Sequence, residues 1–195
     1  LNDPDVTIVD VVSTEDSYAA FTGDGRVICW GEYDCSDIVE ELSANVTALV
    51  SNDKAFAAVK ANGSVITWGE EWAGGAKRQE FGTYRDVSDK LASNVTKVFR
   101  SGENYVPAGK REGFAFAALK SSGEVVVWGY IDTYSSGWYD EADDADGGVI
   151  DIHWSGEALA QTMSDGSITC WGVPDHGGDC GTVAPGPGNF TAISS

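Results

Sequence analysis

A Trp-Gly pair recurs four times in the chain, each time with another glycine five residues before the tryptophan. This repeat restricts the chain to a tandem array of similar units. The pairs are Trp30-Gly31, Trp68-Gly69, Trp128-Gly129 and Trp171-Gly172, and the earlier glycines are Gly25, Gly63, Gly123 and Gly166. Each earlier glycine follows Asp, Asn or Ser, a combination typical of tight hairpin turns. Ala-rich runs such as 55–59 precede the turns and β-branched runs such as 124–127 follow them. The repeat therefore predicts four β-hairpins.

A further strand is expected to open each unit. Ile8, Val46 and Val149 each fall 17 residues before the turn glycine of their unit, whereas Val95 falls 28 residues before its own. The difference predicts an inserted surface loop around residues 105–111. We therefore predict one all-β domain over residues 1–195, with units at 6–43, 44–92, 93–147 and 148–188 and with 189–195 as the opening strand of a fifth unit.

The pattern of an Ala-rich strand, a Gly turn and Val-x-x-Trp-Gly, seen in 55–69 and 114–129, resembles the regulator of chromosome condensation repeat. The resemblance implies propeller-like blades or an open β-repeat array. That family usually closes a ring of seven blades, and its loop after Trp-Gly ends in a Gln-Leu-Gly-like element. This chain has four units, and only Gly74-Gly75 and Gly177-Gly178 remain of that loop. The resemblance thus implies a shape, and the exchange-factor activity of the family's nuclear member is not carried over.

Composition excludes several classes of function. The chain has 12 basic and 31 acidic residues and a formal net charge of -19, which disfavours nucleic acid as a partner. No run approaches the roughly 18 apolar residues that would span a bilayer, so membrane insertion is not expected. A hydrophobic content of 42% is sufficient for a buried core.

The four cysteines occur as two local pairs at equivalent places in the repeat. Cys29 and Cys170 each precede a repeat tryptophan, and Cys35 and Cys180 follow shortly after. The recurrence favours the disulfides Cys29–Cys35 and Cys170–Cys180 among the three possible connectivities. Each would stabilise by about 2 to 3 kcal/mol. The alternatives are free buried thiols or a zinc site, which the histidine spacing does not favour.

Asn-x-Ser/Thr sequons indicate glycosylation, and three of them share one repeat position. Asn45, Asn94 and Asn189 directly precede opening strands, whereas Asn62 lies in a hairpin turn. The alternative is that Asn and Thr simply suit the entry to a strand, and Asn62 has a clear turn role of its own. With the paired cysteines, the sequons favour a secreted or cell-surface protein.

Two further groups of side chains are candidate binding sites. Asp143, Asp144 and Asp146 could offer carboxylates to calcium, but Ala142 stands where a calcium loop needs a carboxylate, so we expect a solvated acidic loop and no required cofactor. Trp72, Trp138 and Tyr139 lie in loops where flat rings could stack on a glycan or anchor a protein. They could equally cover blade edges. The repeat tryptophans are expected in the core.

No catalytic motif stands out, because His153 and His176 lack a nucleophile partner and there is no nucleophile elbow or phosphate loop. We therefore predict a non-enzymatic extracellular scaffold that self-assembles head-to-tail, in a filament-type arrangement. Its expected contact elements are the first strand, with Ile8 and Val12, and the terminal strand, with Phe190 and Ile193. The main alternative is a secreted module that binds glycan or protein through its loop aromatics. A secreted hydrolase with paired acids and an intracellular exchange factor are less favoured.

Overall fold

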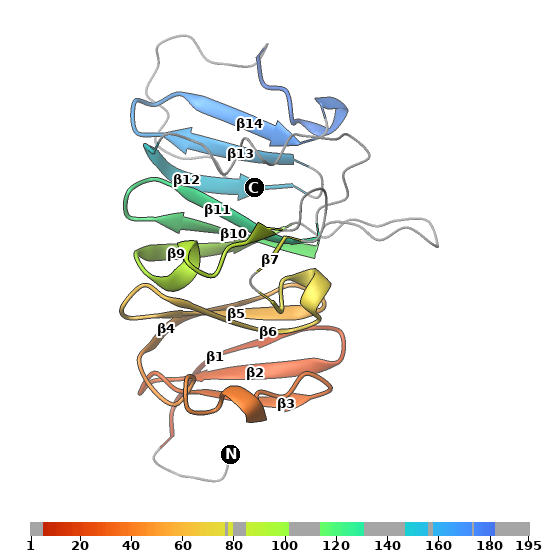
Figure 1. The fold of residues 1–195 in the computed structure, drawn as a ribbon, viewed down its shortest axis with the longest axis vertical. Coiled ribbons are helices and arrows are strands. Elements are labelled where there is room, and N and C mark those ends of the chain that lie inside the picture. The colour runs from red at the N-terminus through yellow and green to blue at the C-terminus, as the bar shows by residue number, and fades with distance from the viewer. Residues whose placement is uncertain are drawn as a thin grey trace.

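The computed structural model describes residues 6–76, 78–79, 85–101, 114–130, 147–155, 158–172 and 174–181. Over these residues the chain folds into four β-sheets, one for each predicted unit, which follow one another along the long axis of the molecule (Figure 1). The predicted all-β repeat fold is confirmed, and we call the sheets blades 1 to 4 in chain order.

Every blade has a core of three antiparallel strands that follow one another in the chain. Blade 1 contains β1 (Ile8–Ser13), β2 (Ser17–Thr22) and β3 (Val27–Gly31); blade 2 contains β4 (Val46–Ser51), β5 (Ala55–Lys60) and β6 (Val65–Gly69). Blade 3 contains β9 (Val95–Arg100), β10 (Phe114–Lys120) and β11 (Val125–Tyr130); blade 4 contains β12 (Val149–Trp154), β13 (Ala158–Met163) and β14 (Ile168–Gly172). Short 3-10 helices lie in the connections: η1 (Ser36–Ile38), η2 (Glu71–Ala73), η3 (Lys90–Ala92) and η5 (Pro174–His176).

The predicted hairpins form where the turn glycines allow them. Gly25, Gly63, Gly123 and Gly166 all have positive φ, between 77° and 84°. The preceding side chain helps to close the turn, as in blade 2, where Asn62 Oδ1 accepts hydrogen bonds from the backbone N and the hydroxyl of Ser64. The hairpin register then brings Phe56 opposite Trp68. Because directly opposite residues share one face of a sheet, the repeat tryptophan and its partner stack.

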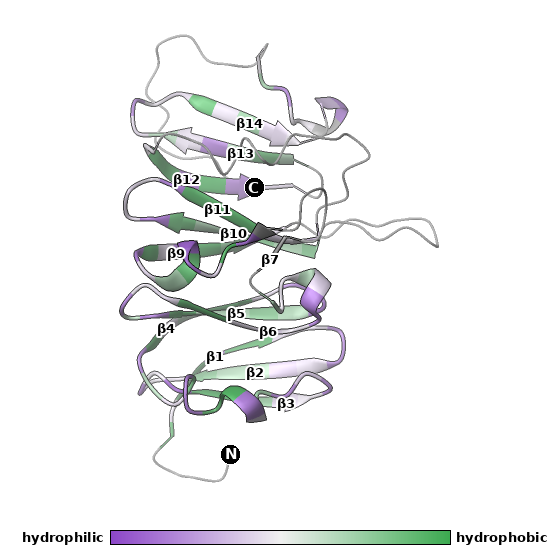
Figure 2. Cartoon of the chain, viewed as in Figure 1, coloured by the Kyte–Doolittle hydropathy of each residue, from purple (hydrophilic) through white to green (hydrophobic). Residues whose placement is uncertain are grey.

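The joints between blades bury these pairs against alanines of the preceding blade. The pairs are Phe56–Trp68 on Ala19 of blade 1, Phe116–Trp128 on Ala55 and Ala57 of blade 2, and Leu159–Trp171 on Ala115 and Ala117 of blade 3. The alanines let the large rings approach the neighbouring sheet closely. Figure 2 shows the hydrophobic residues mainly in the strands and the hydrophilic ones mainly in the turns, with both kinds in the 3-10 helices.

A backbone contact fixes the blades to one another at the hairpin turns. Asn94 precedes the first strand of blade 3 and has a left-handed backbone, with φ of 64°. The next residue, Val95, donates its backbone N–H to the carbonyl oxygen of Gly63 in blade 2, at 3.0 Å. A Cβ on Gly63 would lie 2.5 Å from the nitrogen of Asn94, so only glycine fits at this joint. The equivalent hydrogen bond, from Val46 to the carbonyl oxygen of the turn glycine of blade 1, joins blades 1 and 2.

The connection that leaves blade 2 completes the sheet of blade 3. Its strands β7 (Arg78–Gln79) and β8 (Arg85–Asp86) add to the edge of blade 3, where β7 runs parallel to β11. In the same connection, the carbonyl oxygen of Gly74 accepts a hydrogen bond from Trp128 Nε1 at 3.1 Å. Gly74 therefore anchors the connection after blade 2 to blade 3.

Both predicted disulfides are present, Cys29–Cys35 in blade 1 and Cys170–Cys180 in blade 4. Each joins the strand that carries the repeat tryptophan to the connection that follows it. Cys35 is buried in the core shared by blades 1 and 2. The disulfides thus hold these connections against the blades that they leave.

Candidate functional site

Blade 1 carries an exposed apolar surface on the face that points away from blade 2. Its prominent side chains are Ile8, Val11, Tyr18 and Trp30, which the strand register places on one face and which are 40%, 50%, 48% and 38% exposed. Tyr18 lies directly opposite Trp30, and the two rings stack with their centroids 5.4 Å apart. We call this surface, formed by these four residues, the outer aromatic face. Sequence analysis named the first strand as a contact element but missed the exposed aromatic pair, because the repeat places all four tryptophans in equivalent positions.

The equivalent pairs in the next two blades are buried. Phe56 and Trp68 are 0% and 6% exposed, and both Phe116 and Trp128 are 0% exposed. The expectation that the repeat tryptophans belong to the core is therefore correct for Trp68 and Trp128 and wrong for Trp30. The reason is positional, because no described blade precedes blade 1 to cover its ring.

Blade 4 is the last described blade, and its outer face carries mainly small side chains in place of aromatic rings. Its face away from blade 3 carries Ala158, Ala160, Thr162, Ile168 and Cys170, as the cross-strand register requires. We call this the outer alanine face. Ala160 is half-buried, whereas the equivalent Ala19, Ala57 and Ala117 are 0% exposed beneath the blade that follows them.

The opening strands lie next to one another from blade to blade, and those of blades 3 and 4 carry charged residues that pair across their joint. Lys97 of blade 3 donates a hydrogen bond to Asp151 of blade 4 at 3.0 Å, and His153 Nε2 lies 3.5 Å from the same carboxylate. Burial is the largest single influence and raises the pKa of Asp151, but the hydrogen bonds from Lys97 and from the backbone of Ile152, together with the nearby positive charge, lower the pKa overall. This lysine and this aspartate occupy the same repeat position in adjacent blades.

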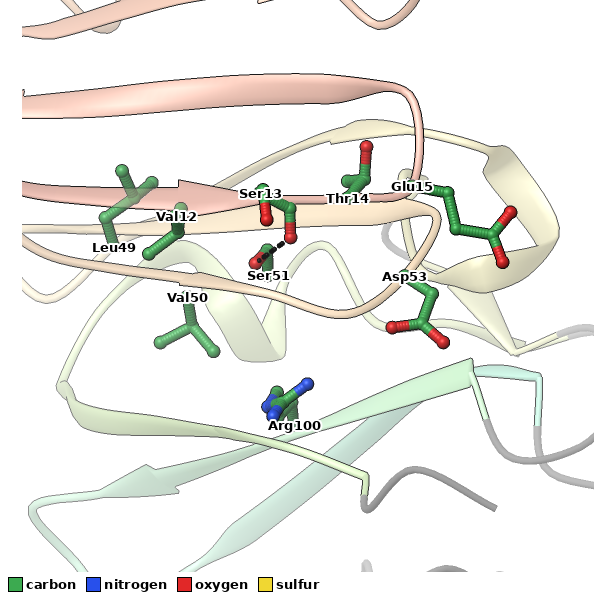
Figure 3. A pocket seen from close by; sticks show the side chains of 9 residues that line it. All are labelled: Val12, Ser13, Thr14, Glu15, Leu49, Val50, Ser51, Asp53 and Arg100. Atoms are coloured by element: carbon green, nitrogen blue, oxygen red, sulfur yellow. Dashed lines mark hydrogen bonds between the residues drawn. The ribbon is translucent and has the colours of Figure 1, made fainter. Parts of the chain in front are cut away.

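A cavity of about 530 Å³ opens where β1, β4 and β9 end (Figure 3). Its lining combines apolar, hydroxyl and charged residues: Val12, Ser13, Thr14, Glu15, Leu49, Val50, Ser51, Asp53 and Arg100. The hydroxyl of Ser51 donates to the carbonyl oxygen of Ser13 at 2.7 Å across the joint. Glu15 forms an ion pair with Lys54 at 2.6 Å, and this hydrogen bond raises the pKa of Lys54. The charged lining therefore already has partners within the protein at several points.

Two of the predicted glycosylation sites lie exposed at blade joints. Asn45 and Asn94 are both exposed and left-handed, and their sequon threonines bond the neighbouring strand, as Thr47 does with the carbonyl of Val59. Their backbone conformation explains Asn at these positions without a glycan, since Asn tolerates positive φ. Asn62 is exposed in a hairpin turn.

Several predicted contact residues differ from one another in their surroundings. Trp72 is half-buried, with its ring edge-on to Phe114 at 5.1 Å and to Tyr130 at 6.0 Å, so it packs against blade 3. Ile8 is 40% exposed, whereas Val12 packs toward blade 2. The other predicted residues lie outside the described part of the chain: Trp138, Tyr139, Asp143, Asp144, Asp146, Asn189, Phe190 and Ile193.

The described residues contain no group of three or more His, Cys, Asp or Glu side chains placed to hold a metal ion. Among the same residues, no helix has the length and hydropathy that a bilayer-spanning segment requires.

No protein-family model matches the chain, and no curated protein matches it. Among solved structures, yeast RCC1 (Prp20) bound to Kap60 matches with a TM-score of 0.51 and 16% identity, over 86% of this chain and 42% of that chain. Human WBSCR16 matches with a TM-score of 0.50 and 18% identity, over 88% and 49%. The ectodomain of the receptor kinase CR4 from Physcomitrella patens gives 0.48 and 13%, over 88% and 42%. The chain spans about half the length of these structures, and its blades have the fold of RCC1 blades.

Proposed function

We propose that the protein is an extracellular, glycosylated structural subunit without enzymatic activity, and that it self-assembles through the open faces of its end blades. The outer aromatic face is the observation that carries this proposal. Exposed apolar patches of this kind mark interaction sites on soluble proteins. Fully burying one such side chain stabilises an interface by roughly 1.5 to 3 kcal/mol, before the cost of association.

The internal joints support self-assembly over capture of an unrelated partner. In blades 2 and 3 the same stacked pair is covered by a blade of this chain, so a surface that fits the pair already exists within the protein. The outer alanine face of blade 4 has the same kind of residues. A molecule with both halves of a joint at the two ends of its described stack can associate with another copy of itself.

Replacing Trp30 with alanine is expected to weaken self-association by at least tenfold, because the ring lies at the centre of the proposed contact. Sedimentation velocity over a range of protein concentrations measures this change. Val39→Ala is the matched control, since Val39 is 57% exposed in a connection that lies off the outer aromatic face. Equal weakening by both variants, or no effect of Trp30→Ala, would contradict the proposal.

The two disulfides support placement in an oxidising compartment. The intact mass of the native protein is expected to fall on treatment with a peptide-N-glycosidase, which hydrolyses the glycan-bearing side-chain amide and converts Asn45 and Asn94 to aspartate wherever it removes a glycan. Thiol-reactive reagents are expected to label none of the four cysteines before reduction. An unglycosylated protein with reactive thiols would instead indicate an intracellular role.

The alternative of a glycan-binding or protein-binding module depends on the loop aromatics. The packing of Trp72 against Phe114 and Tyr130 leaves less of that ring for a ligand. This alternative predicts a monomer whose ligand binding is lost on Trp138→Ala. The Trp30→Ala variant would then bind normally.

A further inference from the structure

We propose that two copies of the chain close one ring of eight blades, in which the outer aromatic face of each copy packs on the outer alanine face of the other. This inference rests on the proposed self-assembly. It specifies the partner, the surfaces in contact and the number of copies at which assembly stops. A closed dimer of this kind replaces the filament expected from the sequence.

The three internal joints provide the template for the contact between copies. At each one, the later blade places a tryptophan and its cross-strand partner against alanines on the middle strand of the earlier blade. The Tyr18–Trp30 pair of blade 1 has the same register and the same stacked arrangement as Phe56–Trp68 and Phe116–Trp128. Blade 1 therefore has the ring pair with which a blade packs against the blade before it.

Blade 4 has the alanines against which the ring pair of a following blade packs. Ala158 and Ala160 occupy the positions of Ala55 and Ala57 in blade 2, two residues apart on the middle strand. Ala160 and Ile168 are half-buried, although their counterparts in blades 1 to 3 are buried. Ala158 and Thr162 on the same face are 5% and 3% exposed. A pair of rings from a second copy can therefore reach only the centre of the face, around Ala160, Ile168 and Cys170.

The number of blades favours closure after two copies. The four blades match 42% of the yeast RCC1 chain and 49% of the human WBSCR16 chain, so they span about half of such a fold. Two halves joined head-to-tail use both open faces of each copy. Because a head-to-tail contact forms a ring when its rotation closes, assembly ends at the dimer. Eight blades lie within the range of known propellers.

The contact between copies differs from the internal joints in its charge. Asp10, Ala48, Lys97 and Asp151 share one repeat position on the opening strands, and Lys97 bonds Asp151 across the joint between blades 3 and 4. A second copy placed in the same register brings its Asp10 to the Asp151 carboxylate. Two carboxylates then face each other, so the joint between copies is weaker at low ionic strength and strengthens as salt screens the repulsion.

Sedimentation equilibrium of the full chain tests the ring. The expected species has twice the chain mass of 20.6 kDa, and its proportion rises with salt. Asp10→Lys is expected to tighten the dimer roughly tenfold, since it replaces a like-charge contact with an opposite-charge one. Glu40→Lys is the matched control, because it makes the same change of net charge in an exposed connection away from the outer aromatic face.

A variant of the opposite face completes the test. Ala160→Trp is expected to abolish the dimer by filling the surface on which Tyr18 and Trp30 would pack, whereas Ala160→Ser preserves it. Unchanged circular dichroism shows that both variants are folded. Filaments or larger oligomers would overturn the closed ring and leave the proposed self-assembly intact. A monomer under all conditions, in the wild type and in Asp10→Lys, would overturn both.

Discussion

Replacing Trp128 with alanine is expected to lower the free energy of unfolding by about 3 to 5 kcal/mol, the usual loss for a fully buried aromatic side chain. Trp128 is 0% exposed, stacks on Phe116 at 5.3 Å and donates its indole N–H to the carbonyl oxygen of Gly74. The substitution leaves a cavity at the joint between blades 2 and 3 and an unpaired carbonyl at its edge. Urea unfolding followed by tryptophan fluorescence measures the loss.

The repeat supplies a control for this experiment at an equivalent position. Trp30→Ala is expected to cost at most about 2 kcal/mol in the monomer, because the ring of Trp30 is 38% exposed and contacts no preceding blade among the described residues. The comparison must be made at a protein concentration where neither variant associates. Trp128→Phe is an intermediate case at the buried site, since it removes the hydrogen bond to Gly74 and retains much, but not all, of the ring packing. Similar losses for Trp128→Ala and Trp30→Ala would show that another part of the chain covers Trp30.

Gly63→Ala is expected to destabilise the protein by about 2 to 5 kcal/mol, through strain at two levels. The first is local, because φ of 77° is unfavourable for alanine. The second is a collision between blades, because the added Cβ would lie 2.5 Å from the backbone nitrogen of Asn94. Relief requires blade 3 to move away from blade 2, and this movement also weakens the hydrogen bond from Val95 to Gly63.

Gly25→Ala separates these two effects. Gly25 has a similar φ of 83°, but its Cβ would lie 3.1 Å from the nitrogen of Asn45, a contact that a small shift relieves. We expect Gly63→Ala to exceed Gly25→Ala by about 1 to 3 kcal/mol. The same urea titrations give both values. Equal losses would mean that the backbone strain of the turn, and not the joint between blades, determines the cost.

The sequence was sufficient to predict the elements inside each blade. Turn residues such as Asn62-Gly63 and the first residues of the opening strands, such as Val46, are where the repeat predicts them. Local signals determine these features, because a tight turn and a β-branched strand are specified by a few adjacent residues. The disulfides were predictable for a related reason, since each links a strand to the connection directly after it.

The relations between blades were not predictable in this way. The Ala-rich strand around Ala57 was recognised as a strand, but its role as the surface that receives Trp128 depends on which sheet packs beside it. The addition of β7 to the sheet of blade 3 also escaped notice, because two residues in a long connection carry no periodicity. Trp30 was assigned to the core because its position in the repeat is the same as that of the buried tryptophans. A repeat makes every unit look alike, whereas its position in the stack decides which faces are covered.

The two disulfides both belong to blades at the ends of the described stack, blade 1 and blade 4. In a linear array, each repeat is stabilised by its own contacts and by those with its neighbours, so a terminal repeat loses one set and frays first. Covalent closure of the connections at Cys29–Cys35 and Cys170–Cys180 acts where this fraying would begin. In a single copy of the chain, each disulfide stabilises a blade that has a described neighbour on one side only. Unfolding that starts at blade 1 or blade 4 is therefore slowed at its first step.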